Sequence, residues 1–169
     1  RPTSGALIFA LHKNAARIMS QRFEASEVSK VYLALVRGIT PDSGTIDNPV
    51  PKKPKGPRVD AITDFRRLFT FERYSLVEAR PQTGRLHQIR RHLKHITHPL
   101  IGDVKYGKGD QNRLFRERFG LERLALHALR VGFVHPISNE TMQVVAPVPA
   151  DLEEPFSKMG IPPEVLEPS

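Results

Sequence analysis

The sequence predicts a single α+β domain, in which a mixed, largely antiparallel sheet is flanked by helices and loops. Short apolar runs of strand length recur along the chain and are bounded by turn residues, as in hairpin-connected strands. Two other segments carry apolar residues at helical spacing, and no internal repeat is visible. The 169 residues suffice for one domain with its own core.

The first elements are a strand, a helix and a second strand. Residues 6–11 form a short apolar run and predict a buried strand. Residues 14–23 carry their apolar side chains on one face and predict a helix. Residues 30–37 alternate with period two, so they predict a strand on which Tyr32 faces away from Leu33.

Residues 40–58 are rich in proline and glycine and predict a loop or a short edge hairpin. The segment ends with four bases, namely Lys52, Lys53, Lys55 and Arg58. They form either a solvated linker or a mobile arm that touches phosphates.

The second half of the chain predicts further strands and helices. Two strands joined by a turn are expected, then a helix that starts at Gly84 or Arg85 and ends before Pro99, then a short helix and two last strands. In order, these segments are residues 61–68, 74–79, 84–97, 113–119, 124–133 and 141–146. The proline-rich end of the chain is expected to be irregular with one short helix.

The charge distribution points to a polyanionic partner. The net charge is +8, but residues 147–169 hold five acids and one base, which gives −4 there and +12 over residues 1–146. Such an excess is typical of nucleic-acid binding, although some basic proteins are merely soluble. The chain has no cysteine, no apolar run long enough for a membrane span and no visible targeting segment, so we expect a cytoplasmic protein.

The helix at residues 84–97 contains an arginine close to its apolar stripe. Leu86, Ile89, Leu93 and Ile96 form the stripe, and Arg90 lies on it or beside it. A guanidinium at the edge of a core needs an acidic partner, unless its stem packs and its head reaches water. The sequence therefore asks which acid meets Arg90.

The same helix is rich in histidine, which raises the possibility of a metal-dependent nuclease or hydrolase. Its histidines are His87, His92, His95 and His98. Their spacings of five, three and three, with no glutamate among them, do not match a zinc-hydrolase helix. We therefore expect no metal and interpret these histidines as polar surface groups or phosphate contacts.

Several segments resemble one enzyme family. "RPQTGRLHQIRRHLKHITHPLIGDVKYG" is similar to the signature of the RluA-type pseudouridine synthases, "SKVYLALVRG" to the family's tyrosine strand, and "RLALHALRVGFVHPISNE" to its Leu-His-Ala strand. The resemblance covers nearly all of residues 1–150. The Gln-Asn-Arg and Phe-Gly-Leu segments are most similar to the TruC branch, which modifies uridine 65 of tRNA.

The resemblance implies an isomerase that converts a uridine of RNA to pseudouridine by base flipping, glycosidic bond cleavage and re-attachment through C5, without a cofactor. Residues 1–150 would be the catalytic domain and residues 151–169 an acidic tail. The family's nucleophile is an aspartate that would stand immediately before Arg1 and is absent from this chain. Asp103 matches an aspartate of the Ile-Gly-Asp turn and is interpreted as structural.

The resemblance also suggests a role for particular residues. Arg90 would pair with the nucleophilic aspartate, and Tyr32 would stack on the uracil and help to remove the C5 proton. The other expected substrate contacts are Ile89 and Leu126 in the uracil pocket, Arg85 and His87 near the loop or phosphate, and Lys30, Arg91 and Lys94 on the RNA backbone. Ordinary core packing or solvated surface would explain the same residue types.

The expected partner is RNA, most simply tRNA. We expect the protein to act as a monomer and not to associate with a membrane. An rRNA-specific synthase is one alternative. Another is a non-catalytic RNA-binding relative, and the residue encoded before Arg1 distinguishes it from the enzyme.

Overall fold

A computed structural model describes residues 3–167 of the protein. The strands of this range are β1 (Ser4–Gly5), β2 (Ser29–Arg37), β3 (Ser43–Asp47), β4 (Val50–Pro51), β5 (Arg58–Val59), β6 (Ile62–Phe71), β7 (Tyr74–Pro81), β8 (Leu126–Val134) and β9 (Thr141–Val145). Its helices are α1 (Lys13–Glu24), α2 (Gln88–His95), α3 (Gly109–Phe119), α4 (Ala150–Lys158) and the 3-10 turn η1 (Pro163–Leu166).

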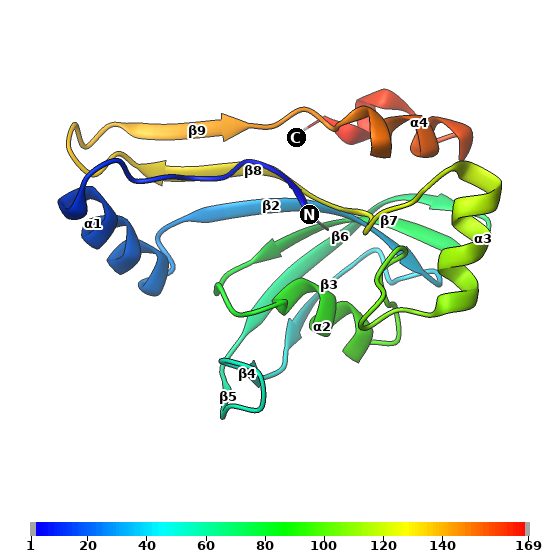
Figure 1. The fold of residues 1–169 in the computed structure, drawn as a ribbon, viewed down its shortest axis with the longest axis horizontal. Coiled ribbons are helices and arrows are strands. Elements are labelled where there is room, and N and C mark those ends of the chain that lie inside the picture. The colour runs from blue at the N-terminus through cyan, green and yellow to red at the C-terminus, as the bar shows by residue number, and fades with distance from the viewer. Residues whose placement is uncertain (1–2, 168–169) are drawn as a thin grey trace.

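One sheet runs through the molecule in the order β1-β8-β2-β7-β6-β3, with β9 also paired to β8 (Figure 1). The β1–β8 pair is parallel, and the other neighbouring strands of this sheet are antiparallel. Strands β4 and β5 form a separate two-stranded hairpin. The predicted α+β class with a mixed, largely antiparallel sheet is confirmed.

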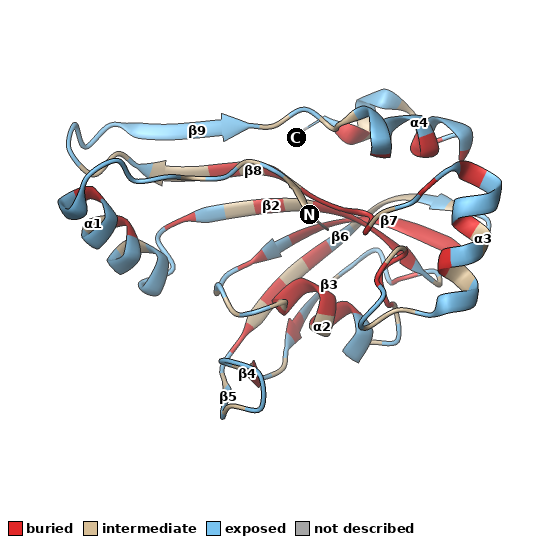
Figure 2. Cartoon of the chain, viewed as in Figure 1, coloured by how far each residue is buried: buried red, intermediate tan, exposed pale blue. Residues whose placement is uncertain are grey.

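The alternation of β2 distributes its side chains between two cores. Leu33 and Leu35 pack with residues of α3 and α4 on one face. Ala34 and Val36 pack with α2 on the other face, and Tyr32 lies against this second cluster. The middle of the sheet is therefore covered on both faces, and Figure 2 shows buried residues gathered there. Tyr32 therefore lies on the α2 side of the sheet. This is the face opposite Leu33, as the period-two pattern predicts.

The prediction of a buried strand over residues 6–11 is wrong. Only Ser4 and Gly5 pair with β8, and the exposed fractions of Leu7, Phe9 and Leu11 are 62%, 76% and 87%. The reason is competition for one strand edge. Strand β1 occupies β8 as far as Ala128, and β9 pairs with β8 from Arg130 onward. The apolar run consequently has no ladder position to enter.

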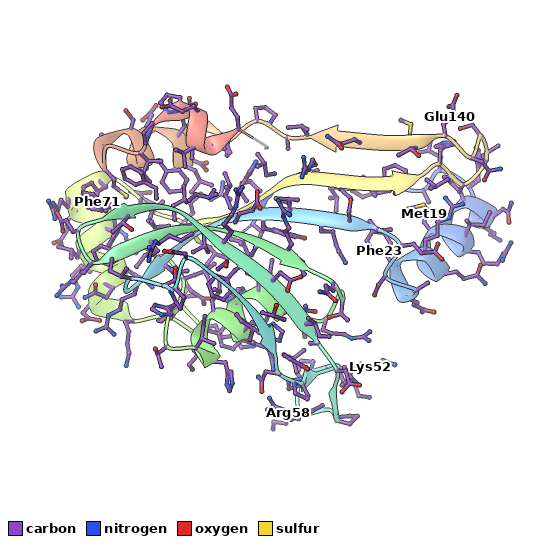
Figure 3. All side chains as sticks on the ribbon, turned by 180° about the vertical axis from the view of Figure 1, so that it is seen from behind. Met19, Phe23, Lys52, Arg58, Phe71 and Glu140 are labelled. Carbon is purple, nitrogen blue, oxygen red and sulfur yellow. The ribbon has the colours of Figure 1, made fainter. Side chains whose placement is uncertain are left out.

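Residues 40–58 contain more strand than the sequence suggested. Strand β3 pairs antiparallel with β6 at the edge of the large sheet, and the β4–β5 hairpin follows it. The sequence pattern does not predict β3, because Gly44 lies inside it and prolines lie on both sides of it. The hairpin extends away from the body of the molecule, and Figure 3 shows Lys52 and Arg58 on it. All four bases of this segment are exposed.

Helix α2 begins three residues later than the predicted start at Arg85. His87 has a left-handed backbone conformation, with φ at 54°, so it cannot continue a helix. The buried Gln88 side chain fixes the approach to the helix: its Oε1 accepts from Thr83 Oγ1 at 2.8 Å, and its Nε2 donates to the Ile62 carbonyl at 2.9 Å. Leu86 therefore lies ahead of the helix and is 38% exposed, not on the core stripe.

The C-terminal residues join the main core. Helix α4 is the one short helix expected there, and η1 follows it. Their apolar side chains pack against β2, β7 and α3 through Leu152, Phe156, Met159, Ile161 and Leu166. Helix α3 also starts earlier than predicted, at Gly109. The acidic side chains remain on the outside of this packed segment, because the apolar ones face inward.

The interpretation of the α2 histidines as surface groups is wrong for His92, whose side chain is completely buried. Its Nε2 donates to the Asn48 carbonyl at 2.9 Å, and its Nδ1 lies 2.9 Å from Thr63 Oγ1. Both ring nitrogens of a neutral imidazole are thereby satisfied. His92 tethers α2 to β6 and to the approach to the β4–β5 hairpin.

We expect the free energy of unfolding to fall between pH 7.5 and pH 5.5. Burial lowers the pKa of His92 and of His127, which is buried on β8. Below the ordinary histidine pKa of about 6.5, the unfolded chain therefore binds protons that the folded chain does not. Urea unfolding at several pH values measures this loss. His92→Gln should reduce it, with the exposed His12→Gln as control, and a flat wild-type profile would contradict the prediction.

Candidate active site

A pocket of about 360 Å³ lies between β2, β8 and the start of α2. A volume of this size suits a small ligand such as a nucleoside. Its apolar lining includes Ile89 and Leu126, both nearly buried, and Tyr32. The remaining lining residues are Thr3, Lys30, Pro81, Thr83, Gly84, Arg85, His87, Gln88 and Arg90. The pocket thus combines an apolar part with a cationic and hydroxyl-bearing part.

The structure brings most of the predicted site residues together at this pocket. Tyr32 and Lys30 come from β2, Leu126 from β8, and Arg85, His87, Ile89 and Arg90 from α2 and the loop before it. Arg91 and Lys94 do not line it. The proposed aspartate lies outside the chain, and Arg1 and Pro2 lie outside the described residues.

Arg90 has a carboxylate partner within the described chain, and this partner is Asp103. The guanidinium donates from Nε to Oδ2 and from Nη2 to Oδ1, each at 2.7 Å. The exposed fractions of the two side chains are 10% for Arg90 and 0% for Asp103. The sequence suggested Asp103 only as a structural turn residue, and the structure adds that it is the acid that a buried arginine needs.

Hydrogen bonding keeps this pair ionised. Burial acts to raise the pKa of Asp103, but the hydrogen bonds from Arg90 and from the amides of Tyr106 and Lys105 outweigh it and lower the pKa below its usual value. The hydrogen bond to Asp103 in turn raises the pKa of Arg90. The pocket consequently contains a permanently charged guanidinium.

Tyr32 lies in the sheet, and its cross-strand partner on each side is an alanine. It pairs with Ala79 of β7 and Ala128 of β8, and an irregularity in the β2–β8 register separates it from Val31. These small neighbours leave its ring as the bulky group on this part of the sheet. Burial raises the pKa of Tyr32, so its hydroxyl is protonated at neutral pH.

The polar rim of the pocket contains a histidine and a lysine whose pKa values are lowered. Burial and the nearby positive charge of Arg90 lower the pKa of His87, which favours the neutral imidazole. Burial and the charge of Arg85 lower the pKa of Lys30, whose Nζ lies 3.5 Å from the Thr83 carbonyl. Arg85 donates from Nε to the Asp60 carbonyl at 3.3 Å. The cations therefore crowd one another, and an anionic ligand would relieve this repulsion.

Arg91 and Lys94 line a second hollow of about 280 Å³ beside α2. Arg58, His95 and Tyr106 are among its other lining residues, so it lies between α2 and the β4–β5 hairpin. The Tyr106 ring lies 5.4 Å from the Arg91 guanidinium and 5.9 Å from Lys94 Nζ. The predicted backbone contacts thus form a separate basic surface.

Sequence reasoning missed Gln88, which lines the pocket, and it missed that Asp103 and Tyr106 contact Arg90 from outside the pocket. All three stand inside the quoted signature, and a buried arginine required an acid, so Asp103 carried a readable signal. Gln88 and Tyr106 carried no comparable signal, because their contacts depend on tertiary structure. Gln88 bonds to Ile62 of β6, and Tyr106, in the loop after α2, contacts His87 at the start of that helix.

The described residues also bear on metal and membrane chemistry. Across residues 3–167, no three histidine, cysteine, aspartate or glutamate side chains are grouped as metal ligands would be. In the same range, no helix has the length and apolarity that a membrane crossing requires.

Comparison with known proteins identifies the class. A family model described as RNA pseudouridylate synthase matches residues 1–95, which is more than half of the chain. The chain belongs to this family, the RluA-type pseudouridine synthases, and is an RNA pseudouridine synthase.

Curated relatives point to one branch of the family. The chain is 40% identical over 181 residues to tRNA pseudouridine synthase C of Haemophilus ducreyi. The aligned region covers 95% of this chain and 74% of the relative. It is 41% identical over 170 residues to tRNA pseudouridine synthase C of Pasteurella multocida, covering 88% of this chain and 70% of the relative.

Solved structures agree with the fold. Human RNA pseudouridylate synthase domain containing 1 matches with a TM-score of 0.67 and 29% identity, over 83% of this chain and 62% of that chain. Human RNA pseudouridylate synthase domain containing 4 matches with a TM-score of 0.76 over 94% of this chain and 72% of that chain. At 24% identity, this second likeness shows the fold alone.

Proposed function

We propose that the protein converts one uridine of tRNA, of the position-65 type, to pseudouridine. The observation that carries the proposal is the joint placement of Tyr32, Ile89, Leu126 and Arg90 around one pocket of nucleoside size. Relatives 36–41% identical to the chain and named tRNA pseudouridine synthase C support the choice of RNA. The catalytic unit would span residues 1–150, followed by the acidic tail of residues 151–169, whose described part packs on the main core, and the protein would act as a monomer in the cytoplasm.

The reaction begins when the uridine is flipped into the pocket. The uracil would stack on Tyr32 between the apolar side chains of Ile89 and Leu126. An aspartate encoded immediately before Arg1 would attack C1′ or C6. Arg90 would hold this carboxylate ionised and oriented, since an adjacent guanidinium lowers the pKa that burial raises.

Isomerisation then exchanges one bond for another. The N1–C1′ bond breaks, the uracil turns, a C5–C1′ bond forms, and the bond to the aspartate breaks, which restores the free carboxylate. C5 loses its proton, N1 gains one, and no oxidant or reductant is needed. The Tyr32 hydroxyl would relay the C5 proton, and Arg85, His87 and Lys30 would orient the RNA at the rim.

Release of tritium from C5 tests this function directly. The full-length protein is incubated with tRNA that carries tritium at uracil C5, and one tritium per tRNA should appear in water. The matched control is the same tRNA with cytidine at position 65, which should release none. If no uridine releases tritium, the proposed function is wrong. If only ribosomal RNA releases tritium, the protein is a pseudouridine synthase whose substrate is rRNA and not tRNA.

We expect binding of tRNA to weaken steeply with salt, because Arg91 and Lys94 would neutralise backbone phosphates. Arg91→Gln and Lys94→Gln should each lower affinity across tRNA sequences and reduce the slope of log K against log salt by about 1. Filter binding at several salt concentrations measures this slope. Lys158→Gln on α4 is the control, and an unchanged slope in both the Arg91 and the Lys94 variant would contradict the phosphate contacts.

A further inference from the structure

The turn from Asp103 to Tyr106 lies behind Arg90, and neither residue lines the pocket. We propose that this turn is the positioning element of the active site, because it fixes the plane and the direction of the Arg90 guanidinium. The inference rests on the proposed function, since it concerns how the catalytic arginine is presented to the reacting groups.

Asp103 fixes the guanidinium within its own plane. Its two oxygens accept from Nε and Nη2 at 2.7 Å each, which is the bidentate geometry that allows little rotation. Nη1 is the nitrogen that this carboxylate does not engage. Since Arg90 lines the pocket and Asp103 does not, Nη1 would be the donor that meets a carboxylate or uracil oxygen there in the proposed mechanism.

Tyr106 fixes the guanidinium from its face. The centre of the ring lies 4.9 Å from the Arg90 guanidinium carbon, within the range of a cation–π contact. The Tyr106 hydroxyl also accepts from Arg91 Nε at 3.1 Å and lies 3.2 Å from His87 Nδ1. One side chain thus connects the pocket arginine with a rim histidine and with the basic surface beside α2.

The turn is itself held rigidly, as a positioning element requires. Oδ1 of Asp103 accepts from the amides of Lys105 and Tyr106, both at 2.9 Å. The Asp103 carbonyl accepts from the Gly107 amide at 3.0 Å and from Asn112 Nδ2 at 3.1 Å. Asn112 belongs to α3, so the turn is anchored to a helix that the main core holds in place.

The first test replaces Asp103 with a residue of the same shape. In Asp103→Asn, Oδ1 can still accept from the two amides, but Nδ2 faces the Arg90 donors and breaks the bidentate pair. With saturating tRNA, we expect the single-turnover rate to fall by about 10²-fold, the effect of misplacing a reacting group. The Kd for tRNA should stay within a few-fold, because Asp103 is buried away from the RNA.

Asp151→Asn is the matched control. Asp151 also pairs with an arginine through both oxygens, at 2.9 and 3.0 Å from Arg123 Nη1, but neither residue lines the pocket. Its single-turnover rate should equal that of the wild type. The split between rate and Kd is the readout that a merely structural role would not produce in a folded variant.

A double-mutant cycle shows whether Asp103 acts through Arg90. If it does, Arg90→Met combined with Asp103→Asn should be no slower than Arg90→Met alone. The double variant should also melt at a higher temperature than Asp103→Asn alone, because it leaves no buried guanidinium without an acid. Additive losses of rate would overturn the positioning role.

Tyr106 provides a second variant pair that does not disturb a buried charge. Tyr106→Phe keeps the ring over the guanidinium and should retain a single-turnover rate close to that of the wild type, with weaker tRNA binding. Tyr106→Leu removes the ring and should lower the rate by about tenfold, the weight of one cation–π contact. Equal rates in the two variants would exclude the ring as a positioning group, even if Asp103→Asn failed to fold.

Failure of this inference differs from failure of the proposed function. An active wild type with active Asp103→Asn and Tyr106→Leu variants would overturn the positioning role alone. A wild type that binds tRNA and releases no tritium would instead remove the function on which the inference rests.

Discussion

Arg90→Met should lower the single-turnover rate of pseudouridine formation by at least about 10³-fold, while the Kd for tRNA stays within several-fold. The physical reason is that Arg90 lines the pocket, with its guanidinium paired to Asp103 and its side chain 10% exposed. A group in this position can stabilise charge on reacting atoms, but it adds little to backbone binding. Rapid-quench assays and filter binding measure the two quantities separately.

Arg91→Met is the matched control, because Arg91 is the next residue on α2 and lies outside the pocket. It should show the opposite split, with weaker tRNA binding and an unchanged rate at saturation. Arg90→Met also leaves the buried Asp103 carboxylate without its partner, which destabilises a fold by about 3–5 kcal/mol. Assays are therefore run well below the measured Tm. Lost binding with intact chemistry in Arg90→Met would contradict the assignment.

Tyr32→Phe should lower the single-turnover rate by about 10²-fold, the usual contribution of one positioned proton-transfer group. The phenylalanine keeps the stacking surface for the uracil, so the Kd for tRNA should hardly change. Burial raises the pKa of Tyr32, so the missing group is a protonated hydroxyl, which in the proposed mechanism would relay the C5 proton. Tritium release from C5 should slow together with product formation.

A deuterium label sharpens the test of Tyr32. When C5 deprotonation limits the variant, tRNA with deuterium at uracil C5 should react measurably more slowly than unlabelled tRNA. Tyr74→Phe is the control, because Tyr74 belongs to the core on the other face of the sheet and its hydroxyl donates to Gln111. A Tyr32→Phe variant with the wild-type rate would limit this residue to stacking.

Local patterns in the sequence carry much of the fold and of the candidate site. The alternation of residues 30–37 predicts both the strand and the face of Tyr32, because side chains on a strand must point to alternate sides. The contiguous signature around Arg90 brings Arg85, His87, Ile89 and Arg90 to one pocket, since these residues are neighbours on one loop and helix. Such predictions depend on nearest neighbours along the chain.

Other features depend on partners far away in the sequence. The apolar residues 6–11 resemble a strand, but β9 already occupies the edge of β8 that they would need. His92 is polar and stands on a helix, yet the Asn48 carbonyl and Thr63 satisfy it in a buried position. Neither outcome could be predicted from the local sequence pattern, because each depends on which distant segment occupies the neighbouring position in the folded structure.

The sequence by itself determined the family, the class of sheet and seven of the twelve residues that line the pocket. The tertiary structure decided how Arg90 is held, because the Asp103 carboxylate and the Tyr106 ring come from a turn that follows α2 and is anchored to α3. The spacing of apolar residues, or a motif, specifies which side chains share a face of a helix or strand. The distance between two charged groups on different elements is set only when both are packed on a common core.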